Sequence, residues 1–170
     1  DRPYEMTVEY DVPAIDALLA RFGAKPWVED RPRLVIFLAV HHIGNEYVLS
    51  STIDAGDLQR EAFQDAAWRY GLEVVIPAER MLQQAGLDVA SLPQAPLSTL
   101  QSLLDASVGQ RPLAGTLNWS RELLGWTSTW RLDHQGTEHR WGADGGNFDA
   151  AFRLAVGGAA QILSGNGTPD

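Results

Sequence analysis

Histidine is the residue type in this sequence best suited to metal binding, and two of the four histidines lie close together. His134 and His139 flank a Gln-Gly-Thr-Glu segment, and a hairpin there would bring both rings near each other, beside Asp133 and Glu138. Two imidazoles and a carboxylate are ligands that zinc or nickel accepts. The alternative is a solvated hairpin tip, and we assign no metal site to the chain.

The other two histidines, His41 and His42, are adjacent at the end of an apolar run. Neighbouring residues of a strand point to opposite faces, so this pair cannot chelate one ion. The chain has no Gly-x-Ser-x-Gly elbow, no phosphate-binding loop with a lysine, and no cysteine to act as nucleophile or zinc ligand. We therefore expect no catalytic residues and no cofactor. A hydrolase that uses carboxylates such as Asp133, Asp144 and Asp149 ranks third among our hypotheses.

Four of the six tryptophans crowd into the last third of the chain, at Trp119, Trp126, Trp130 and Trp141. Large aromatic side chains dominate hydrophobic cores, so one interpretation is packing beneath a final helix. The other is a stacking surface for a glycan or another small molecule, which would leave an exposed apolar patch. On this second interpretation the candidate ligand-binding residues are Trp126, Trp130 and Trp141.

Trp68 has a different setting. A helix predicted over 57–70 places it opposite the apolar stripe, beside Asp57 and Glu61. Tryptophan is often an anchor in protein–protein interfaces. We expect this face to contact a partner protein of the bacterial envelope or an upstream segment of the same protein, with Trp68, Asp57 and Glu61 as candidate partner-binding residues.

Composition narrows the classes of partner. The 170 residues carry a net charge of −9, and no basic stripe is present, which argues against nucleic acid. The longest apolar run, 34–40, is far shorter than the roughly 20 residues that span a bilayer. The chain begins at Asp1 and not at a methionine, which we interpret as a processed or excised fragment.

Periodicity predicts a series of strands and helices. The apolar stripe of the helix over 57–70 is expected to contain Leu58, Ala62, Phe63, Ala66, Ala67 and Tyr70. Asn147 is expected to cap the last helix, in which Gly157 and Gly158 suggest a close packing contact. The expected strands are 4–12, 34–40, a hairpin partner at 46–51 after a Gly44-Asn45 turn, 72–76, 113–119, 126–133 and 138–142. The other expected helices are 13–22, 78–85 and one from a capping box at Ser98 to Ala106.

This order predicts an α/β fold, more narrowly α+β, in which one mixed sheet has helices packed on it. The run 34–40 is continuously apolar, so we expect a central strand that is covered on both faces. A terminal hairpin, turning at Gln135-Gly136, should precede the C-terminal helix. We expect a single domain over 1–164 and a frayed tail over 165–170.

Several segments are similar to one known family. They are Tyr4-Glu-Met-Thr-Val-Glu-Tyr-Asp11, Ala17-Leu-Leu-Ala20, Trp27, Arg31-Pro-Arg-Leu-Val-Ile-Phe37, Ala67-Trp-Arg-Tyr-Gly71 leading into Val74-Val-Ile-Pro77, and Leu113-Ala-Gly115 followed by Trp126 and Trp130. In these segments the chain resembles the proteobacterial domain of unknown function 2066 family. The resemblance implies secretion to the periplasm and supplies no catalytic residues, because the family has no assigned chemistry.

Together these observations favour a non-catalytic periplasmic binding or assembly module of the bacterial envelope that acts through protein–protein contacts. The alternative is a small-molecule or glycan-binding domain that uses the tryptophan-rich hairpin. A concave pocket beside those tryptophans would favour the ligand, whereas flat apolar surface near Trp68 would favour the partner.

Overall fold

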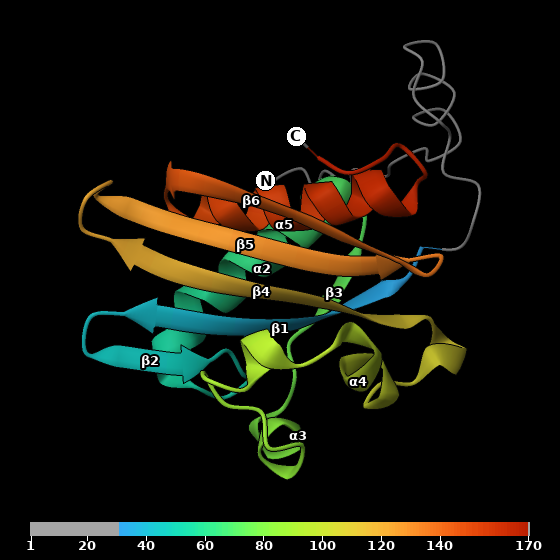
Figure 1. Ribbon diagram of the computed structural model, residues 1–170, viewed down its shortest axis with the longest axis horizontal. Helices are drawn as coiled ribbons and strands as arrows, with labels where there is room; N and C mark the ends of the chain where they lie inside the picture. Colours follow the sequence, from blue (N-terminus) through green and yellow to red (C-terminus); the bar gives the residue numbers. More distant parts are fainter. Residues whose placement is uncertain (1–30, 170) are drawn as a thin grey trace, which may run out of the picture.

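The computed structural model describes residues 31–169, which form one mixed sheet of six strands with four α-helices packed on it (Figure 1). This confirms the predicted fold class. The predicted strand 4–12 and helix 13–22 lie outside the described residues. In chain order the strands and helices are β1 Arg33–His42, β2 Asn45–Val48, α2 Asp57–Tyr70, β3 Glu73–Val75, α3 Glu79–Gln84, α4 Leu97–Ser102, β4 Gln110–Ser120, β5 Gly125–His134, β6 Thr137–Gly146 and α5 Phe148–Leu163.

Strand β1 lies at the centre of the sheet, whose order is β2-β1-β4-β5-β6 with β3 also paired to β1. The pairs β1–β3 and β1–β4 are parallel, and the pairs β1–β2, β4–β5 and β5–β6 are antiparallel. From Leu34 to Val40 every residue of β1 is at most 1% exposed. The continuous apolar run therefore is the buried central strand that its composition predicts.

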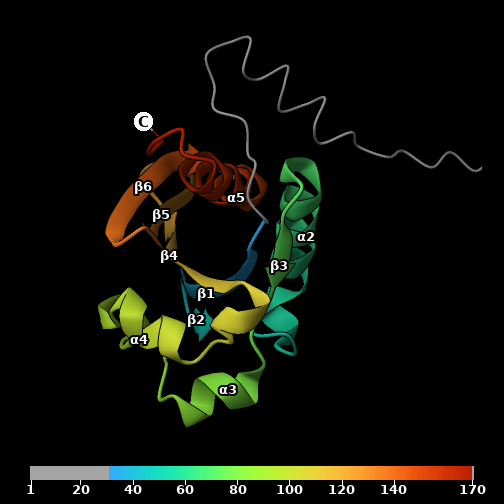
Figure 2. The ribbon, with the colours of Figure 1, turned by 90° about the vertical axis from the view of Figure 1, so that its right-hand side faces the viewer.

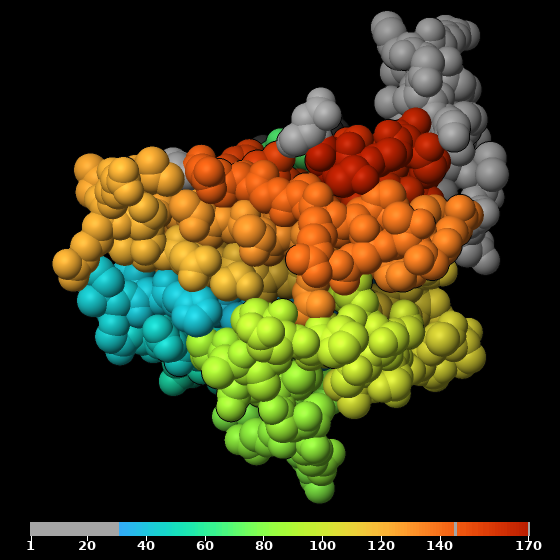
Figure 3. Space-filling model, in the orientation of Figure 1, coloured from blue at the N-terminus to red at the C-terminus, as the bar shows by residue number. Residues whose placement is uncertain are grey.

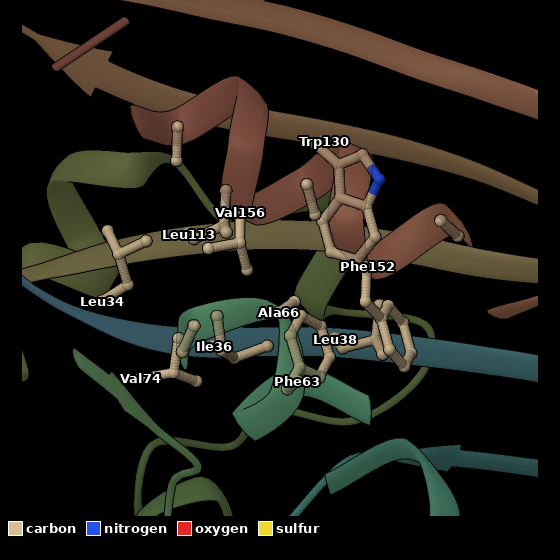
Figure 4. Close-up of a cluster of buried hydrophobic side chains, with 14 of the residues drawn as sticks. Leu34, Ile36, Leu38, Phe63, Ala66, Val74, Leu113, Trp130, Phe152 and Val156 are labelled. Atoms are coloured by element: carbon tan, nitrogen blue, oxygen red, sulfur yellow. The ribbon is translucent and has the colours of Figure 1, made fainter. Parts of the chain in front are cut away.

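The side chains of β1 alternate between two hydrophobic cores. Leu34, Ile36 and Leu38 join the larger core, where α2 and α5 cover one face of the sheet (Figure 4). Val35 and Phe37 join a smaller core on the other face, built with residues of α3, of α4 and of the 3-10 turn η2 (Leu92–Gln94). Figure 2 shows α2 and α5 on one side of the sheet and α3 and α4 on the other. This covers β1 on both faces, as predicted.

The second face is covered over only part of its width. The segment that contains α3, η2 and α4 packs over β1 and the neighbouring part of β4. Figure 3 looks onto this face, where β5 and β6 (orange) lie beside that segment (green to yellow) without a helix over them. Thr129 of β5 and Arg140 of β6 are exposed there. This uncovered part of the sheet holds the candidate site.

Helix boundaries follow local signals. Gly71 ends α2 in the left-handed conformation, with φ of 64°. The Asn147 side chain caps α5 by accepting a hydrogen bond from the Ala150 amide at 2.8 Å, as predicted. Gly157 packs against the Tyr70 ring and Gly158 against the Trp141 indole, so the close contact expected at these glycines is confirmed.

Three local predictions are wrong. Leu58 is 64% exposed and Tyr70 37%, whereas Gln59 is buried, because α2 turns the stripe centred on Phe63 toward the sheet. Helix α4 begins at Leu97 after Pro96 and ends at Ser102, without the side-chain cap expected from Ser98. The β1–β2 turn is Ile43-Gly44, since Asn45 already pairs with His42, and β2 ends at Val48.

Candidate functional site

A cleft of about 430 Å³ lies on the partly covered face of the sheet, between η2 and strands β4 to β6. Pro93 of η2 is exposed and forms its apolar wall, beside the carbonyl of Leu92, whose side chain is buried in the smaller core. Four polar side chains of the strands line it as well, and these are Thr116, Thr129, Arg131 and Arg140. The volume is in the range of small-molecule sites, and an apolar wall with a few convergent polar groups is their usual composition.

The register of the strands brings the polar groups together in two adjacent rows. Arg131 of β5 is directly opposite Arg140 of β6. Thr116 of β4 is directly opposite Thr129 of β5. Residues two apart on a strand share a face, so Thr129 and Arg131 point to the same side of the sheet. The two rows therefore place two guanidinium groups beside two hydroxyl groups.

Arg131 connects the sheet to the wall of the cleft. Its Nη2 donates a hydrogen bond to the Leu92 carbonyl at 3.0 Å. Desolvation by partial burial lowers the pKa of Arg131 from its ordinary value. The charge of Glu138 opposes that shift, and the charge of Arg140 adds to it. Arginine keeps its proton in proteins, so Arg131 is a fixed positive charge in a partly desolvated position.

Arg140 has a different partner. Its Nε donates to the Glu138 carboxylate at 2.7 Å, and the Arg140 side chain is 72% exposed. Asp133, which is opposite Glu138 in the sheet, accepts a hydrogen bond from the Gly136 amide in the hairpin turn. Glu138 and Asp133 lie on the same face as the two arginines, so these four formal charges cancel, but within the described residues Arg131 forms an ion pair with neither carboxylate.

Trp130 and Trp141, two of the candidate ligand-binding residues, belong to the core on the opposite face. The Trp130 ring packs edge-on against Phe63 of α2 and Phe152 of α5 (Figure 4). Its Nε1 donates a hydrogen bond to the Ser128 hydroxyl. Trp141 donates from Nε1 to the Leu154 carbonyl of α5. Both are buried beneath the final helix. Because their rings lie on the helix side, they meet the cleft through their main chains and offer no stacking surface there.

Gly115 makes room for the Trp130 ring. The two residues are directly opposite each other in the β4–β5 register. A Cβ on Gly115 would lie 2.2 Å from Cε3 of Trp130, which no side chain tolerates. The glycine therefore allows the indole to lie flat over the sheet beneath α5 and keeps it out of the cleft.

Trp126 belongs to an aromatic cluster at one end of the helix-covered face. Its ring centroid lies 5.3 Å from that of His42, 5.4 Å from that of Trp119 and 6.4 Å from that of Phe148. Trp126 is half-buried, so it is the one candidate ligand-binding residue with partly accessible ring surface. The cluster lies on the face opposite the cleft and cannot contribute to it.

His41 and His42 are on opposite faces of the sheet, whereas His134 and His139 share one face, diagonally across the β5–β6 hairpin. His41 faces away from His42 and lies 3.5 Å from the Glu46 carboxylate, so the two rings do point to opposite faces. His139 is opposite Leu132, and its Nδ1 is hydrogen-bonded to the Thr168 hydroxyl of the C-terminal segment. Within residues 31–169, no group of three or more histidine, aspartate or glutamate side chains could hold a metal ion.

Asp133 and Glu138 are directly opposite each other in the β5–β6 register, one position along from Leu132 and His139. Successive residues of a strand alternate faces, so these carboxylates point away from the ring of His139. The hairpin therefore does not combine its imidazoles and its carboxylates into one set of ligands.

The candidate partner-binding residues are all on the outer face of α2. Trp68 is 64% exposed, and Asp57 and Glu61 are exposed as well. The Asp57 carboxylate bonds the Arg60 guanidinium, which also donates to the carbonyls of the loop before the helix. Asp57 thus has a structural role at the start of α2, and Trp68 provides the apolar surface of this face.

A second, polar cleft of about 300 Å³ runs between α2 and α5. It contains two carboxylates, Asp65 and Asp149, and two guanidinium groups, Arg69 and Arg153. Their formal charges cancel, so this groove offers no net charge to attract an ionic ligand. It contains paired carboxylates, but among the described residues its only apolar lining residues are Ala62 and Ala66, so it has no apolar wall comparable to Pro93.

Sequence reasoning missed Arg131, Arg140, Leu92 and Pro93. The first two could have been found from the predicted hairpin, because they lie at equal distances from the Gln135-Gly136 turn and must therefore face each other. The wall could not have been found in this way, because η2 (Leu92–Gln94) lies outside every strand and helix that the sequence predicts.

Neither a family model, nor a curated protein, nor a solved structure matches this chain. The resemblance to the domain of unknown function 2066 family therefore stays a prediction. None of the helices within the described residues has the length and apolar character needed to cross a membrane.

Proposed function

We propose that this domain is a non-catalytic binding module that holds a small ligand in the cleft beneath Leu92 and Pro93. The observation that carries the proposal is the cleft itself, where two opposed arginines and an apolar wall meet in about 430 Å³. This gives the small-molecule alternative a different site from the one expected, because the tryptophan rings serve the core.

The side chains in the cleft are suited to binding. Guanidinium groups donate hydrogen bonds and carry charge but do not exchange protons near neutral pH. A threonine hydroxyl becomes a nucleophile only beside a general base. The described residues that line the cleft include neither a histidine nor a carboxylate that could act as that base. Binding without catalysis is therefore the function that these groups support best.

A periplasmic location in the bacterial envelope is part of the same proposal. It is supported by the family resemblance alone, which implies secretion. The fold is compatible with several compartments, and the acidic composition does not distinguish between them.

A fragment screen on the 170-residue chain by two-dimensional NMR tests the proposal. Binding in the cleft should shift the amide signals of Gly115, Thr116, Thr129 and Arg131 together. Thr129→Tyr should abolish these shifts, because the larger side chain fills the cleft. The substitution should not disturb the fold, since Thr129 is exposed and aromatic residues suit strands. Thr137→Tyr, at an exposed position outside the cleft, is the matched control. Equal binding by Thr129→Tyr and the unchanged chain would contradict the proposal.

Protein–protein contact through the outer face of α2 is the second candidate, with an envelope protein or an upstream segment as the partner. The observation in its favour is that Leu58 and Trp68, on one helix, are each 64% exposed. Affinity capture from envelope extract should recover a partner with the unchanged chain and lose it with Trp68→Ala. Recovery of the same protein by both chains would contradict this candidate.

A further inference from the structure

The two arginines of the cleft form a like-charge pair across neighbouring strands. Arg131 and Arg140 are directly opposite in the β5–β6 register, where Cβ atoms are about 4.5–5.5 Å apart. Like charges directly opposite each other destabilise a sheet. The Glu138 carboxylate offsets part of this repulsion through its ion pair with Arg140, and an anionic ligand between the two guanidinium groups would offset the rest.

Existing contacts use only part of the hydrogen-bonding capacity of this pair. Each guanidinium has five N–H donors. Within residues 31–169, Arg131 uses one on the Leu92 carbonyl and Arg140 uses one on Glu138, so these contacts leave four donors on each side chain. Both side chains line the same cleft, so these donors can converge on one ligand.

The charges in the cleft are unequally compensated. Glu138 forms an ion pair with Arg140 at 2.7 Å. The hydrogen-bond partner of Arg131 is a carbonyl, which is neutral, and within the described residues Arg131 has no carboxylate within ion-pair distance. The partly buried Arg131 therefore is the stronger point of attraction for a negative group, since burial reduces screening by water and salt.

The remaining surfaces specify the rest of the ligand. Thr116 and Thr129 add hydroxyl donors one row away from the arginines, and Pro93 offers an apolar surface. A molecule that satisfies both parts has a compact negative head and an apolar body.

We infer that the cleft recognises the carboxylate or phosphate group of a small amphiphilic molecule through the opposed guanidinium groups of Arg131 and Arg140. Arginine matches these oxyanions because its planar fork donates two parallel hydrogen bonds to their oxygens. The inference rests on the proposed function and adds to it the chemical class of the ligand.

A purely structural role for the pair makes a different prediction. Arg131 bonds η2 and would serve the fold without any ligand. Among the described residues Arg140 forms a hydrogen bond and an ion pair with Glu138 alone, and its side chain is 72% exposed, so its loss should leave the fold unchanged. Arg140→Gln therefore separates ligand recognition from stability.

Titration of the intact chain with octanoate, with octanamide and with inorganic phosphate, followed by NMR shifts at the cleft, tests the inference. Octanoate should bind at least about tenfold more tightly than octanamide, because hydrogen bonds to a charged group are about twice as strong as neutral ones. Phosphate binding at the cleft without octanoate binding would also support an oxyanion site and would assign the head group to phosphate. Arg140→Gln should weaken octanoate or phosphate binding about tenfold with unchanged thermal unfolding, whereas Arg121→Gln in the β4–β5 turn should not.

Different results would overturn the oxyanion inference and the proposed ligand site. Equal shifts at the cleft from octanoate and octanamide would overturn the inference and leave the proposed ligand site in place. The absence of cleft shifts from all three probes, together with a fragment screen that finds no cleft binder, would overturn both.

Discussion

Trp141 and Gly158 are in direct contact between the last strand and the last helix. The indole Nε1 of Trp141 donates to the Leu154 carbonyl at 2.9 Å, and a Cβ on Gly158 would lie 2.5 Å from that nitrogen. The contact lets α5 approach the sheet closely enough to bury the aromatic residues beneath it. It also explains why a glycine is retained inside a helix, where it costs stability.

Gly158→Ala should destabilise the protein. Overpacking a core contact costs about 1–3 kcal/mol, which exceeds the roughly 1 kcal/mol of helix propensity that alanine gains over glycine. Urea unfolding followed by tryptophan fluorescence measures the free energy of unfolding. Gly146→Ala is the control, since its Cβ would be 3.5 Å from the Ala150 side chain, an ordinary contact. An increase in the stability of Gly158→Ala would contradict the packing described here.

Phe63 and Leu58 of α2 should respond very differently to truncation. Phe63 is fully buried and stacks on Phe152 with ring centroids 3.8 Å apart, so Phe63→Ala should cost about 3–5 kcal/mol. Leu58 is 64% exposed, so Leu58→Ala should stay within about 0.5 kcal/mol of the unchanged chain. Thermal or urea unfolding compares the two variants. Similar losses would mean that the apolar stripe of α2 faces another way.

Removal of the two predicted helix caps should have different effects on the free energy of unfolding. Asn147→Ala removes the hydrogen bond to the Ala150 amide and should cost about 1 kcal/mol. Ser98 makes no capping bond at the start of α4, so Ser98→Ala should leave the free energy of unfolding nearly unchanged. Both variants can be compared in one set of urea denaturation curves. A larger loss of stability for Ser98→Ala than for Asn147→Ala would show that Ser98 caps α4, and would contradict a start of α4 at Leu97 without a side-chain cap.

Ionisation of the Tyr47 hydroxyl should make the protein less stable at high pH. Burial raises the pKa of Tyr47 above its ordinary value, against the opposite effect of Arg60, and the hydroxyl donates to the Ala55 carbonyl at 3.0 Å. In the unfolded chain tyrosine ionises near pH 10. The folded chain keeps the proton to higher pH, so the free energy of unfolding falls as pH rises from about 10 through the folded pKa. Below about pH 10 the term is constant.

Denaturant curves between neutral pH and pH 11 on the unchanged chain and on Tyr47→Phe test this term. The variant should lose less stability over the alkaline part of the range, because its buried ring has no proton to lose. Parallel pH profiles for the two chains would show that Tyr47 does not contribute.

The fold could largely be predicted because its elements are locally consistent. The apolar run of β1, the amphipathic pattern of α5, the Asn147 cap and the Gln135-Gly136 turn each specify one structure. The errors fall where tertiary contacts decide. The orientation of α2 is set by packing around Phe63, and Pro96 determines where α4 begins.

The candidate site was harder to predict for a physical reason. Aromatic residues suit both cores and ligand sites, so the sequence alone left both interpretations of the tryptophans open. The register that places Gly115 opposite Trp130 shows that the Trp130 ring lies on the helix side. The cleft depends on a contact between Arg131 and the Leu92 carbonyl, which are 39 residues apart. No periodicity in the sequence encodes such a contact. The arginines line a cleft only because η2 packs beside them in the folded chain.

The proposed ligand lies between η2 and the two arginines of the cleft. Isotope-filtered NMR on the chain with bound octanoate, or with hexyl phosphate if phosphate is the preferred head group, locates the ligand directly. We predict contacts from the ligand chain to the ring of Pro93 and to the methyl groups of Thr116 and Thr129. Contacts confined to Leu58 and the other residues of the outer face of α2, with none at the cleft, would contradict the account.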